Sequence, residues 1–201
     1  MAELKLVSPL LSNMEVVSCI SARGAVSVYL VKSTKTAQTY ILKHISVPES
    51  QKQVDALLFT GAANSTEDAQ KYYEQVVTDY REELETLEQL AASPNLDCFR
   101  SYQIEPKEDG VGFDIYLLAE HRTTLSEYLA DNAITHLCAV NLAMDLCSAL
   151  VDLRAAGLVH RDVKPENIIL RGAEAVLIDF DAARLHKPEH ENDTQILGTT
   201  G

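Results

Sequence analysis

Two segments in the last quarter of the chain combine residue types that can carry out chemistry. The first reads HRDVKPENIIL, from His160 to Leu170, and the second, DFDAAR, begins nine residues later at Asp179. Together they supply carboxylates, a lysine and a side-chain amide at short spacing. Carboxylate and amide oxygens bind hard cations such as Mg²⁺, and a lysine can hold phosphate charge. The two segments therefore contain most of the parts of a phosphoryl-transfer site.

The sequence of the amino-terminal part of the chain predicts antiparallel strands. Residues 15–33 and 38–45 are rich in Val, Ile and Tyr and are separated by turn-like residues. A second strand pair is predicted at 99–105 and 111–120, joined by a loop around PKEDG.

A long amphipathic helix is predicted between these strand pairs, over residues 66–91. Ser65, with Asp68 three residues later, resembles a capping box at its start. Apolar residues then recur at three- and four-residue steps, at Ala69, Tyr72, Tyr73, Val76, Val77, Tyr80, Leu84, Leu87 and Leu90. A shorter helical stretch precedes it and is expected to end at Gly61.

The carboxyl-terminal part predicts helices and short strands. Helices are expected at 124–132 and at 135–157, where Gly157 can end the second one. Brief strands are expected at 167–170 and 175–180. Because strands and helices do not alternate regularly, the order indicates an α+β chain in two parts, with a boundary near 121–124.

Composition and charge exclude several kinds of partner. The net charge of −13 argues against a nucleic-acid partner or an anionic membrane surface, since both need a basic footprint. The amino end shows no signal-peptide pattern, and no stretch approaches 18 uninterrupted apolar residues. We therefore expect a cytoplasmic protein with no membrane segment.

The cysteines give no sign of a metal site or a disulfide framework. The chain has 4 of them, with no CxxC pair and no clustered histidines nearby. Reduced and largely buried thiols are the expectation.

The two chemical segments resemble the catalytic loop and metal-binding segment of eukaryotic-type Ser/Thr protein kinases, a family that also occurs in bacteria. The resemblance extends from about Val16 to the end of the chain, and it includes LGTTG at 197–201, which is similar to the distal activation segment of bacterial members. It implies a small antiparallel-sheet lobe with a long helix over 1–122, carrying a helical insertion at about 48–66. Residues 123–201 would then form a partial helical lobe that ends within the activation segment.

This resemblance assigns roles in a transfer of the ATP γ-phosphate to a protein hydroxyl group, with Mg²⁺ as the second cofactor. It implies that Asp162 accepts the proton of the hydroxyl and that Lys164 reaches the γ-phosphate, a lysine that also marks Ser/Thr specificity. Asn167 and Asp179 would hold Mg²⁺. His160 and Arg161 would be structural, with Arg161 able to pair with a phosphorylated activation segment.

Two charged residues of the first lobe are expected to meet. YILK resembles the third-strand motif, which makes Lys43 the residue that holds the α- and β-phosphates. Its partner should be Glu83, which has leucines four and seven residues later in the family's register. Glu82 and Glu85 are the alternatives.

The resemblance also implies an adenine pocket. Its residues would be Val28 and Ile41 above the base, Ile169 below it, Ala119 as gatekeeper, and the backbone of Glu120 and Arg122 at the hinge. The alternative is that these are simply core residues of the strands.

Several positions depart from the family pattern. The phosphate loop G-x-G-x-x-G-x-V reads SARGAVSV here, from Ser21 to Val28, so that Gly24 is its one glycine and stands at none of the three usual positions. Ile41 replaces a small alanine, and Asp181 stands where a glycine is expected. Because glycine allows close backbone approach to phosphate, nucleotide binding could be weakened.

Three functions therefore stay open from the sequence. A Ser/Thr protein kinase is favoured because every polar position of the transfer site is filled. A pseudokinase that acts as a nucleotide-binding or scaffolding module is favoured by the degenerate phosphate loop and Asp181. A small-molecule phosphotransferase shares the H-x-D-x-x-x-x-N loop, but Lys164 and the GTTG segment argue against it. We also expect the 201-residue chain to be a poor catalyst by itself. The exposed apolar helix around CAVNLAMDLCSALVDL should lead either to self-association or to a rearranged second lobe.

Overall fold

A computed structural model describes residues 10–108, 110–180 and 182–185, and they fall into two compact units. The first unit comprises Met1–Arg81 and Phe99–His121, and the second comprises Glu82–Cys98 and Arg122–Gly201. The sequence-based division placed all of residues 1–122 in the first part. Residues 82–98 belong to the second unit because their last residues are hydrogen-bonded to it: Leu177 N–H donates to Asn95 O at 2.9 Å, and Asp97 N–H donates to Leu177 O at 3.0 Å.

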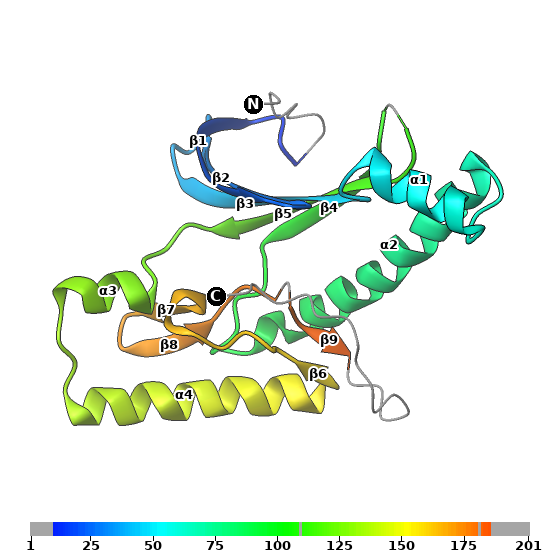
Figure 1. The fold of residues 1–201 in the computed structure, drawn as a ribbon. Helices are drawn as coiled ribbons and strands as arrows, with labels where there is room; N and C mark the ends of the chain where they lie inside the picture. The colour runs from blue at the N-terminus through cyan, green and yellow to red at the C-terminus, as the bar shows by residue number, and fades with distance from the viewer. Residues whose placement is uncertain (1–9, 109, 181, 186–201) are drawn as a thin grey trace. The chain divides into compact units, whose positions relative to one another are not determined.

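The first unit is built on the predicted antiparallel sheet (Figure 1). Its strand order is β1-β2-β3-β5-β4. The strands are β1 (Met14–Arg23), β2 (Val26–Ser33), β3 (Thr39–Val47), β4 (Ser101–Pro106) and β5 (Phe113–Glu120). Each predicted strand pair is therefore confirmed. The long connection between β3 and β4 holds two helices.

The two faces of this sheet have different characters. Residues that face one another across antiparallel strands lie on the same face, and successive residues alternate. One face carries a buried core of Val31, Leu42, Tyr116 and Leu118, which packs with Leu11 and Tyr40. The opposite face carries Val28 and Lys43, which are register partners, and Ile41 with its partner Ala119.

Two helices, α1 (Gln51–Thr60) and α2 (Thr66–Gln89), follow β3 as expected. Gly61 ends α1 in the left-handed conformation at φ 73°, which a residue without Cβ adopts at little cost. Asp68 N–H donates to Ser65 Oγ at 3.2 Å, which confirms the predicted cap of α2. In the first unit, Val54, Ala63, Ala69 and Tyr73 form a buried cluster against the strand ends.

The end of α2 differs slightly from the prediction. The sequence predicted a helix to residue 91, whereas the α-helix ends at Gln89 and a 3₁₀ turn covers Leu90–Ala92. Pro94 explains the early end, because a proline disfavours helical conformation in the residue before it. Ser93 is accordingly extended, with ψ 128°.

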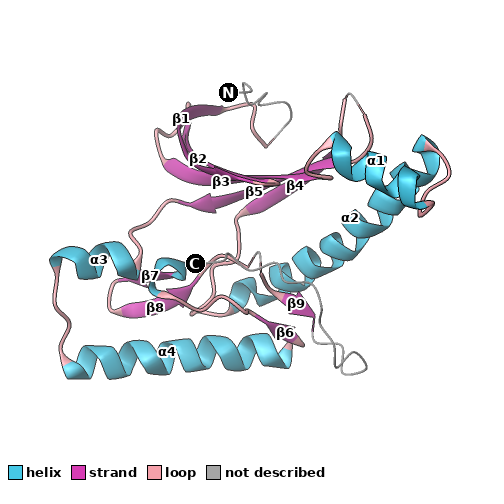
Figure 2. Cartoon of the chain, in the orientation of Figure 1, coloured by secondary structure: helices cyan, strands magenta, loops and turns pink. Residues whose placement is uncertain are grey.

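The second unit combines helices with short strand pairs (Figure 2). Its elements are α3 (Leu125–Asp131), α4 (His136–Ala155), β6 (Leu158–Val159), β7 (Ile168–Arg171), β8 (Glu174–Leu177) and β9 (Arg184–Leu185). A capping box between Thr124 and Glu127 starts α3, and the Thr135 side chain accepts a hydrogen bond from Cys138 N–H at the start of α4. Strands β7 and β8 form a hairpin, and β6 pairs with β9.

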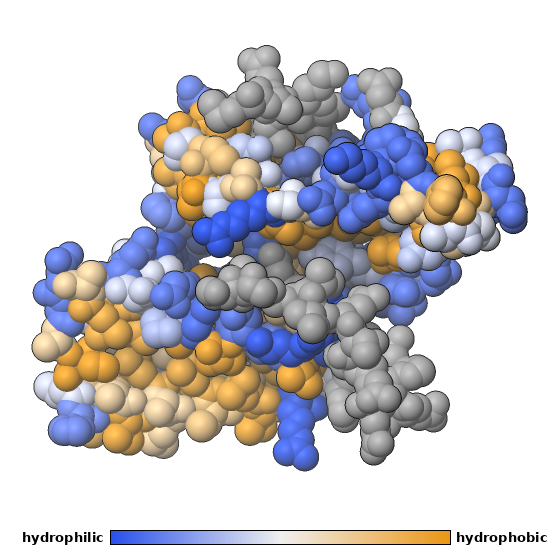
Figure 3. Space-filling view, in the orientation of Figure 1, coloured by the Kyte–Doolittle hydropathy of each residue, from blue (hydrophilic) through white to orange (hydrophobic). Residues whose placement is uncertain are grey.

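Helix α4 has one buried and one exposed apolar face. Leu142, Ala149 and Leu153 are buried, while Ala175 N–H of β8 donates to the Asp145 carboxylate at 2.9 Å. Apolar side chains also gather on the surface over α3 and α4 (Figure 3), and on α4 they include Leu137, Val140, Met144, Leu150 and Val151. By length and composition alone α4 could cross a membrane, a weak criterion that core helices of soluble proteins also meet. One face of α4 contacts β8 within this unit, while most of its apolar residues are exposed.

The cysteines correct one expectation. All 4 are free, as predicted, but only Cys98 and Cys138 are partly buried, whereas Cys19 and Cys147 are exposed. Cys19 lies on edge strand β1, and Cys147 lies on α4. Burial raises the pKa of the Cys98 thiol to about 12, so this thiol stays protonated at neutral pH.

Candidate functional site

The site of the second unit begins at His160, directly after β6. The side chain of His160 is 1% exposed, and its ring makes an edge-to-face contact with Phe180 at a centroid distance of 4.9 Å. Its Nε2 lies 3.0 Å from Ile178 O, and Asp162 N–H donates to its Nδ1 at 3.3 Å. An Nδ1 that accepts requires the neutral imidazole with the proton on Nε2. Burial also lowers the pKa of His160, which favours the same neutral form.

The Asp162 carboxylate is the centre of the predicted catalytic residues. Its Oδ2 lies 2.7 Å from Lys164 Nζ, and it accepts a hydrogen bond from Asn167 Nδ2 at 2.9 Å. Asn167 Nδ2 also donates to Asp162 O at 2.9 Å. The structure thus brings Asp162, Lys164 and Asn167 together, with one carboxylate oxygen held by two donors. The hydrogen bond to Asp162 raises the pKa of Lys164, so its ammonium group is charged at neutral pH.

The other predicted metal ligand, Asp179, follows β8. Asn167 is the last residue before β7, so the β7–β8 hairpin connects the two predicted ligands. Ile178 N–H donates to Asn167 O at 2.9 Å and fixes the two ends of the hairpin to each other. Both Arg161 (φ 68°) and Asp179 (φ 64°) adopt left-handed backbone conformations, which are uncommon outside glycine and are found at functional sites.

The oxygen atoms of this pair suit a hard cation. Asn167 is 4% exposed, and its Nδ2 donates both hydrogen bonds to Asp162, so its Oδ1 is the atom suited to a metal. Mg²⁺ is characteristically bound by one or two protein oxygens, with water and phosphate completing the shell. Among the described residues, no group of three or more His, Cys, Asp or Glu residues is placed to hold a metal.

The predicted nucleotide residues are distributed over both units. Lys43, Val28, Ile41 and Ala119 share one face of the first unit's sheet, opposite the buried core. Glu120 is the last residue of β5, and its carboxylate pairs with Arg100 Nη1 at 2.5 Å. Arg122 and Ile169 belong to the second unit, where Ile169 is 3% exposed.

The structure places Glu83 beside an arginine that sequence reasoning did not assign. Glu83 Oε2 lies 3.6 Å from Arg184 Nη1, and both residues belong to the second unit. The pairing of Glu83 with Lys43 stays a prediction, since Lys43 belongs to the other unit. Arg184 is the last residue of DFDAAR, but nothing in the amino-acid sequence indicates that a residue of α2 lies beside it.

The degenerate phosphate loop forms a tight hairpin between β1 and β2. Arg23 and Val26 are register partners, so Gly24 and Ala25 make the turn, with Gly24 at φ 56°. The single glycine therefore stands where the turn requires a positive φ. Asp181 and the LGTTG segment at 197–201 lie outside the described residues.

Comparison with known proteins matches the chain to one family. The profile of the protein kinase domain matches residues 23–201. Serine/threonine-protein kinase D of Synechocystis is 30% identical over 153 residues, covering 73% of this chain and 27% of that protein. Serine/threonine-protein kinase PkaB of Streptomyces coelicolor is 29% identical over 116 residues, 53% of this chain and 27% of the relative.

A third relative, the probable serine/threonine-protein kinase PknB of Corynebacterium glutamicum, is 27% identical over 123 residues, 61% of this chain and 19% of the relative. The chain thus spans well under half the length of these curated relatives. Since the match covers most of the chain, including strands β2–β5 of the sheet, the HRDVKPEN segment and the β7–β8 hairpin, the chain belongs to the protein kinase domain family.

Proposed function

We propose that this chain is the amino-terminal portion of a Ser/Thr protein kinase that transfers the γ-phosphate of ATP to protein hydroxyl groups. The observation that carries the proposal is the arrangement around Asp162, where Lys164 and Asn167 both hold Oδ2. The lobe division expected from the sequence, with a helical insertion at about 48–66, is part of the same proposal.

The two oxygens of the Asp162 carboxylate would have different roles, one in holding neighbouring side chains and the other in accepting a proton. Because Oδ2 is held by two donors, Oδ1 is the oxygen that would accept the proton of the substrate hydroxyl group. Lys164 is charged and lies next to it, where it would stabilise negative charge on the transferred phosphoryl group. The general base and a phosphate-binding cation thus come from one loop.

Asn167 and Asp179 would hold Mg²⁺ through Asn167 Oδ1 and the Asp179 carboxylate. When bound, Mg²⁺ and ATP supply the activated phosphoryl group and neutralise its charge. The residues of the chain keep the acceptor oxygens in place: the β7–β8 hairpin joins Asn167 to Asp179, and His160 holds Ile178 O.

The first unit would bind the nucleotide through one face of its sheet. Lys43 would hold the α- and β-phosphates and pair with Glu83. Val28, Ile41 and Ala119 would contact the adenine from this face, Ile169 would lie below it, and the backbone of Glu120 and Arg122 would bind its edge. Their common face in the sheet supports this assignment for the residues of the first unit.

Transfer of radiolabelled phosphate to a generic basic protein by the full-length natural protein tests the activity. We expect label on Ser and Thr, dependent on Mg²⁺ and lost in Asp162→Asn. ATP binding without transfer would indicate the pseudokinase function instead, and label on a small-molecule alcohol or amine but not on protein would indicate a small-molecule phosphotransferase.

The proposal includes a cytoplasmic location and self-association through α4. The exposed apolar side chains of α4, such as Leu137 (71% exposed) and Met144 (66%), support association because such surface is commonly covered by a partner. Light scattering on the 201-residue chain should give a mass above that of a monomer, and Leu137→Glu with Met144→Glu should restore the monomer. A monomer at all concentrations would contradict this part.

A further inference from the structure

The linker that follows α2 is paired with β8 like an extra strand. Leu96 and Leu177 form a parallel bridge, and backbone hydrogen bonds join Leu177 N–H to Asn95 O and Asp97 N–H to Leu177 O. Asn95 is 7% exposed and Leu96 is 3% exposed, so this pairing is buried. The linker is therefore an integral part of the second unit.

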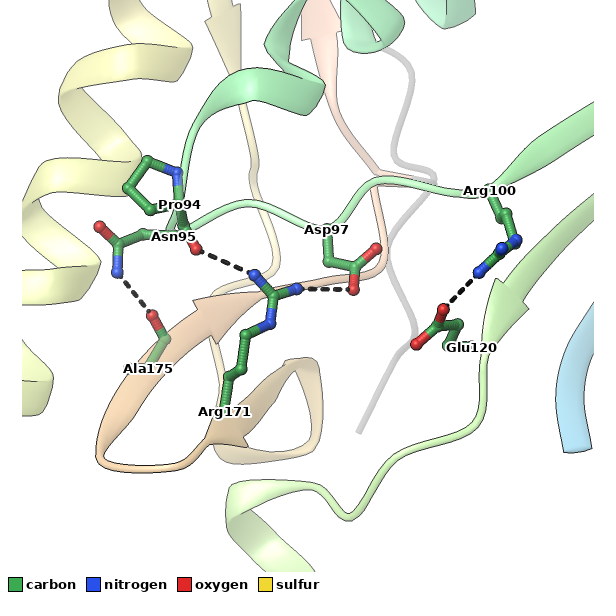
Figure 4. Close-up of polar contacts among 7 residues, drawn as sticks. All are labelled: Pro94, Asn95, Asp97, Arg100, Glu120, Arg171 and Ala175. Atoms are coloured by element: carbon green, nitrogen blue, oxygen red, sulfur yellow. Dashed lines mark hydrogen bonds and ion pairs between the residues drawn. The ribbon is translucent and has the colours of Figure 1, made fainter. Parts of the chain in front are cut away.

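Side chains reinforce this pairing from both ends (Figure 4). Arg171, at the end of β7, donates from Nη1 to Pro94 O at 3.4 Å and from Nη2 to Asp97 Oδ2 at 3.1 Å. Asn95 Nδ2 donates to Ala175 O at 3.0 Å. We call the contact of Arg171 with Pro94 and Asp97 the linker clamp.

The clamp acts on the hairpin that carries the metal ligands. Arg171 ends the strand that begins directly after Asn167, and Leu177, which pairs with the linker, lies two residues before Asp179. On its other side the linker continues into the 3₁₀ turn and the last turns of α2, where Leu84 and Leu87 are buried. A stiff helix transmits the position of its end to residues one or two turns away.

We infer that Arg171 and Asp97 are positioning residues that set the place of Glu83 relative to Asn167 and Asp179. The inference rests on the proposed function, in which Glu83 orients Lys43 toward the phosphates of ATP. The ion pair is partly exposed, with side-chain exposures of 40% for Arg171 and 25% for Asp97. Such pairs contribute little to stability, so the clamp should influence geometry more than folding.

The experiment is a double-mutant cycle in the full-length protein. Arg171→Met keeps the apolar stem of the side chain and removes both donors. We expect it to lower kcat/KM for ATP by about three- to tenfold, chiefly through a higher KM, because Glu83 acts through the phosphate-binding lysine. In a Glu83→Gln background the same substitution should cause no further loss, since both changes affect one pathway.

Two matched variants sharpen the test. Arg171→Lys retains the charge but offers a single ammonium group, so it should recover part of the loss. Lys71→Met removes the cation of an exposed pair with Asp68, 3.8 Å apart on the amino-terminal part of α2, and should leave KM unchanged. Hydrogen exchange provides a readout without turnover: Arg171→Met should accelerate exchange at the backbone amides of residues 82–92.

Each result decides the inference. Faster exchange at 82–92 together with a loss of kcat/KM that disappears in Glu83→Gln supports it. Unchanged exchange, or a loss that adds fully to that of Glu83→Gln, overturns it. Failure of the proposed function is visible separately, because the wild-type protein would then transfer no phosphate.

Discussion

The loop around Asp162 and the β1–β2 hairpin, both proposed to act on phosphate, are ordered in different ways. In the loop, side chains hold one another: Lys164 and Asn167 both contact Asp162, and the His160 ring contacts the chain before Asp179. In the hairpin the order comes from the backbone register that pairs Arg23 with Val26, while the side chains of Ala22 and Arg23 are exposed.

This difference explains why the sequence matches the family at the loop and departs from it at the hairpin. A side chain that supplies a carboxylate or an ammonium group can be replaced by few others. A loop that binds phosphate through backbone N–H groups requires a backbone conformation and space, and one glycine at the turn can supply the conformation. A filled catalytic loop and a degenerate hairpin are therefore compatible in one active enzyme.

The largest effect is expected at the centre of the loop. Asp162→Asn keeps the size of the side chain but removes the proton acceptor and weakens the contact with Lys164. We expect the rate of phosphate transfer to fall by about 10²- to 10⁴-fold, measured with saturating ATP and Mg²⁺. ATP binding should be retained, and an Asn variant with near-normal turnover would contradict the role of Asp162 as the base.

The next largest effect should follow from loss of Lys43, the proposed phosphate-binding lysine. Lys43→Met should reduce kcat/KM by about a hundredfold, or roughly 2.7 kcal/mol in barrier, and Glu83→Gln should reduce it less because it acts through Lys43. Steady-state kinetics at varied ATP concentration measures both. Should Glu82→Gln or Glu85→Gln reduce activity while Glu83→Gln does not, the register on α2 is wrong.

A substitution at Gly24 that disfavours the left-handed backbone conformation should weaken ATP binding. Gly24 has φ 56°, and a Cβ there would make only an ordinary contact of 3.5 Å with Glu49 Oε1, so the cost of Gly24→Val is conformational. A left-handed L-residue costs about 1–2 kcal/mol, and we expect KM for ATP to rise by up to about tenfold.

Gly61→Val is the matched control for the hairpin. Gly61 has φ 73° with nothing within 4 Å of an added Cβ, so the strain is similar but lies at the end of α1. This variant should lose stability in thermal unfolding without a change in KM. An equal rise in KM for both variants would mean that the hairpin has no special part in nucleotide binding.

The smallest effect is expected at Asp181. Because the proposed metal ligand is Asp179, Asp181→Gly in the full-length protein should change turnover by less than about tenfold, or roughly 1.4 kcal/mol. Asp179→Asn, measured beside it, should abolish turnover. If Asp181→Gly instead activates a silent protein, the natural protein is a pseudokinase.

Much of the fold could be predicted because its signals are local. Apolar periodicity located α2, enrichment in Val, Ile and Tyr between turn-like residues located the first strands, and Gly61 and Gly157 marked helix ends. The grouping of Asp162 with Lys164 and Asn167 was equally predictable, since all three come from one short stretch. The contacts that sequence reasoning missed join distant segments: Arg171 with Asp97, Asp145 with Ala175, and Glu83 with Arg184. Such pairs depend on tertiary packing, which produces no periodic pattern in the amino-acid sequence.

At Asp179, the residue type that best fits the left-handed backbone differs from the residue type that the proposed reaction needs. An aspartate tolerates φ 64° better than most residues, yet glycine would adopt it more easily. Selection for thermal stability alone would thus favour Asp179→Gly, a change that would remove a proposed metal ligand. A thermostabilised form of this domain should accordingly be sought at sites away from this segment, because the proposed role of the Asp179 carboxylate requires that this backbone cost be kept.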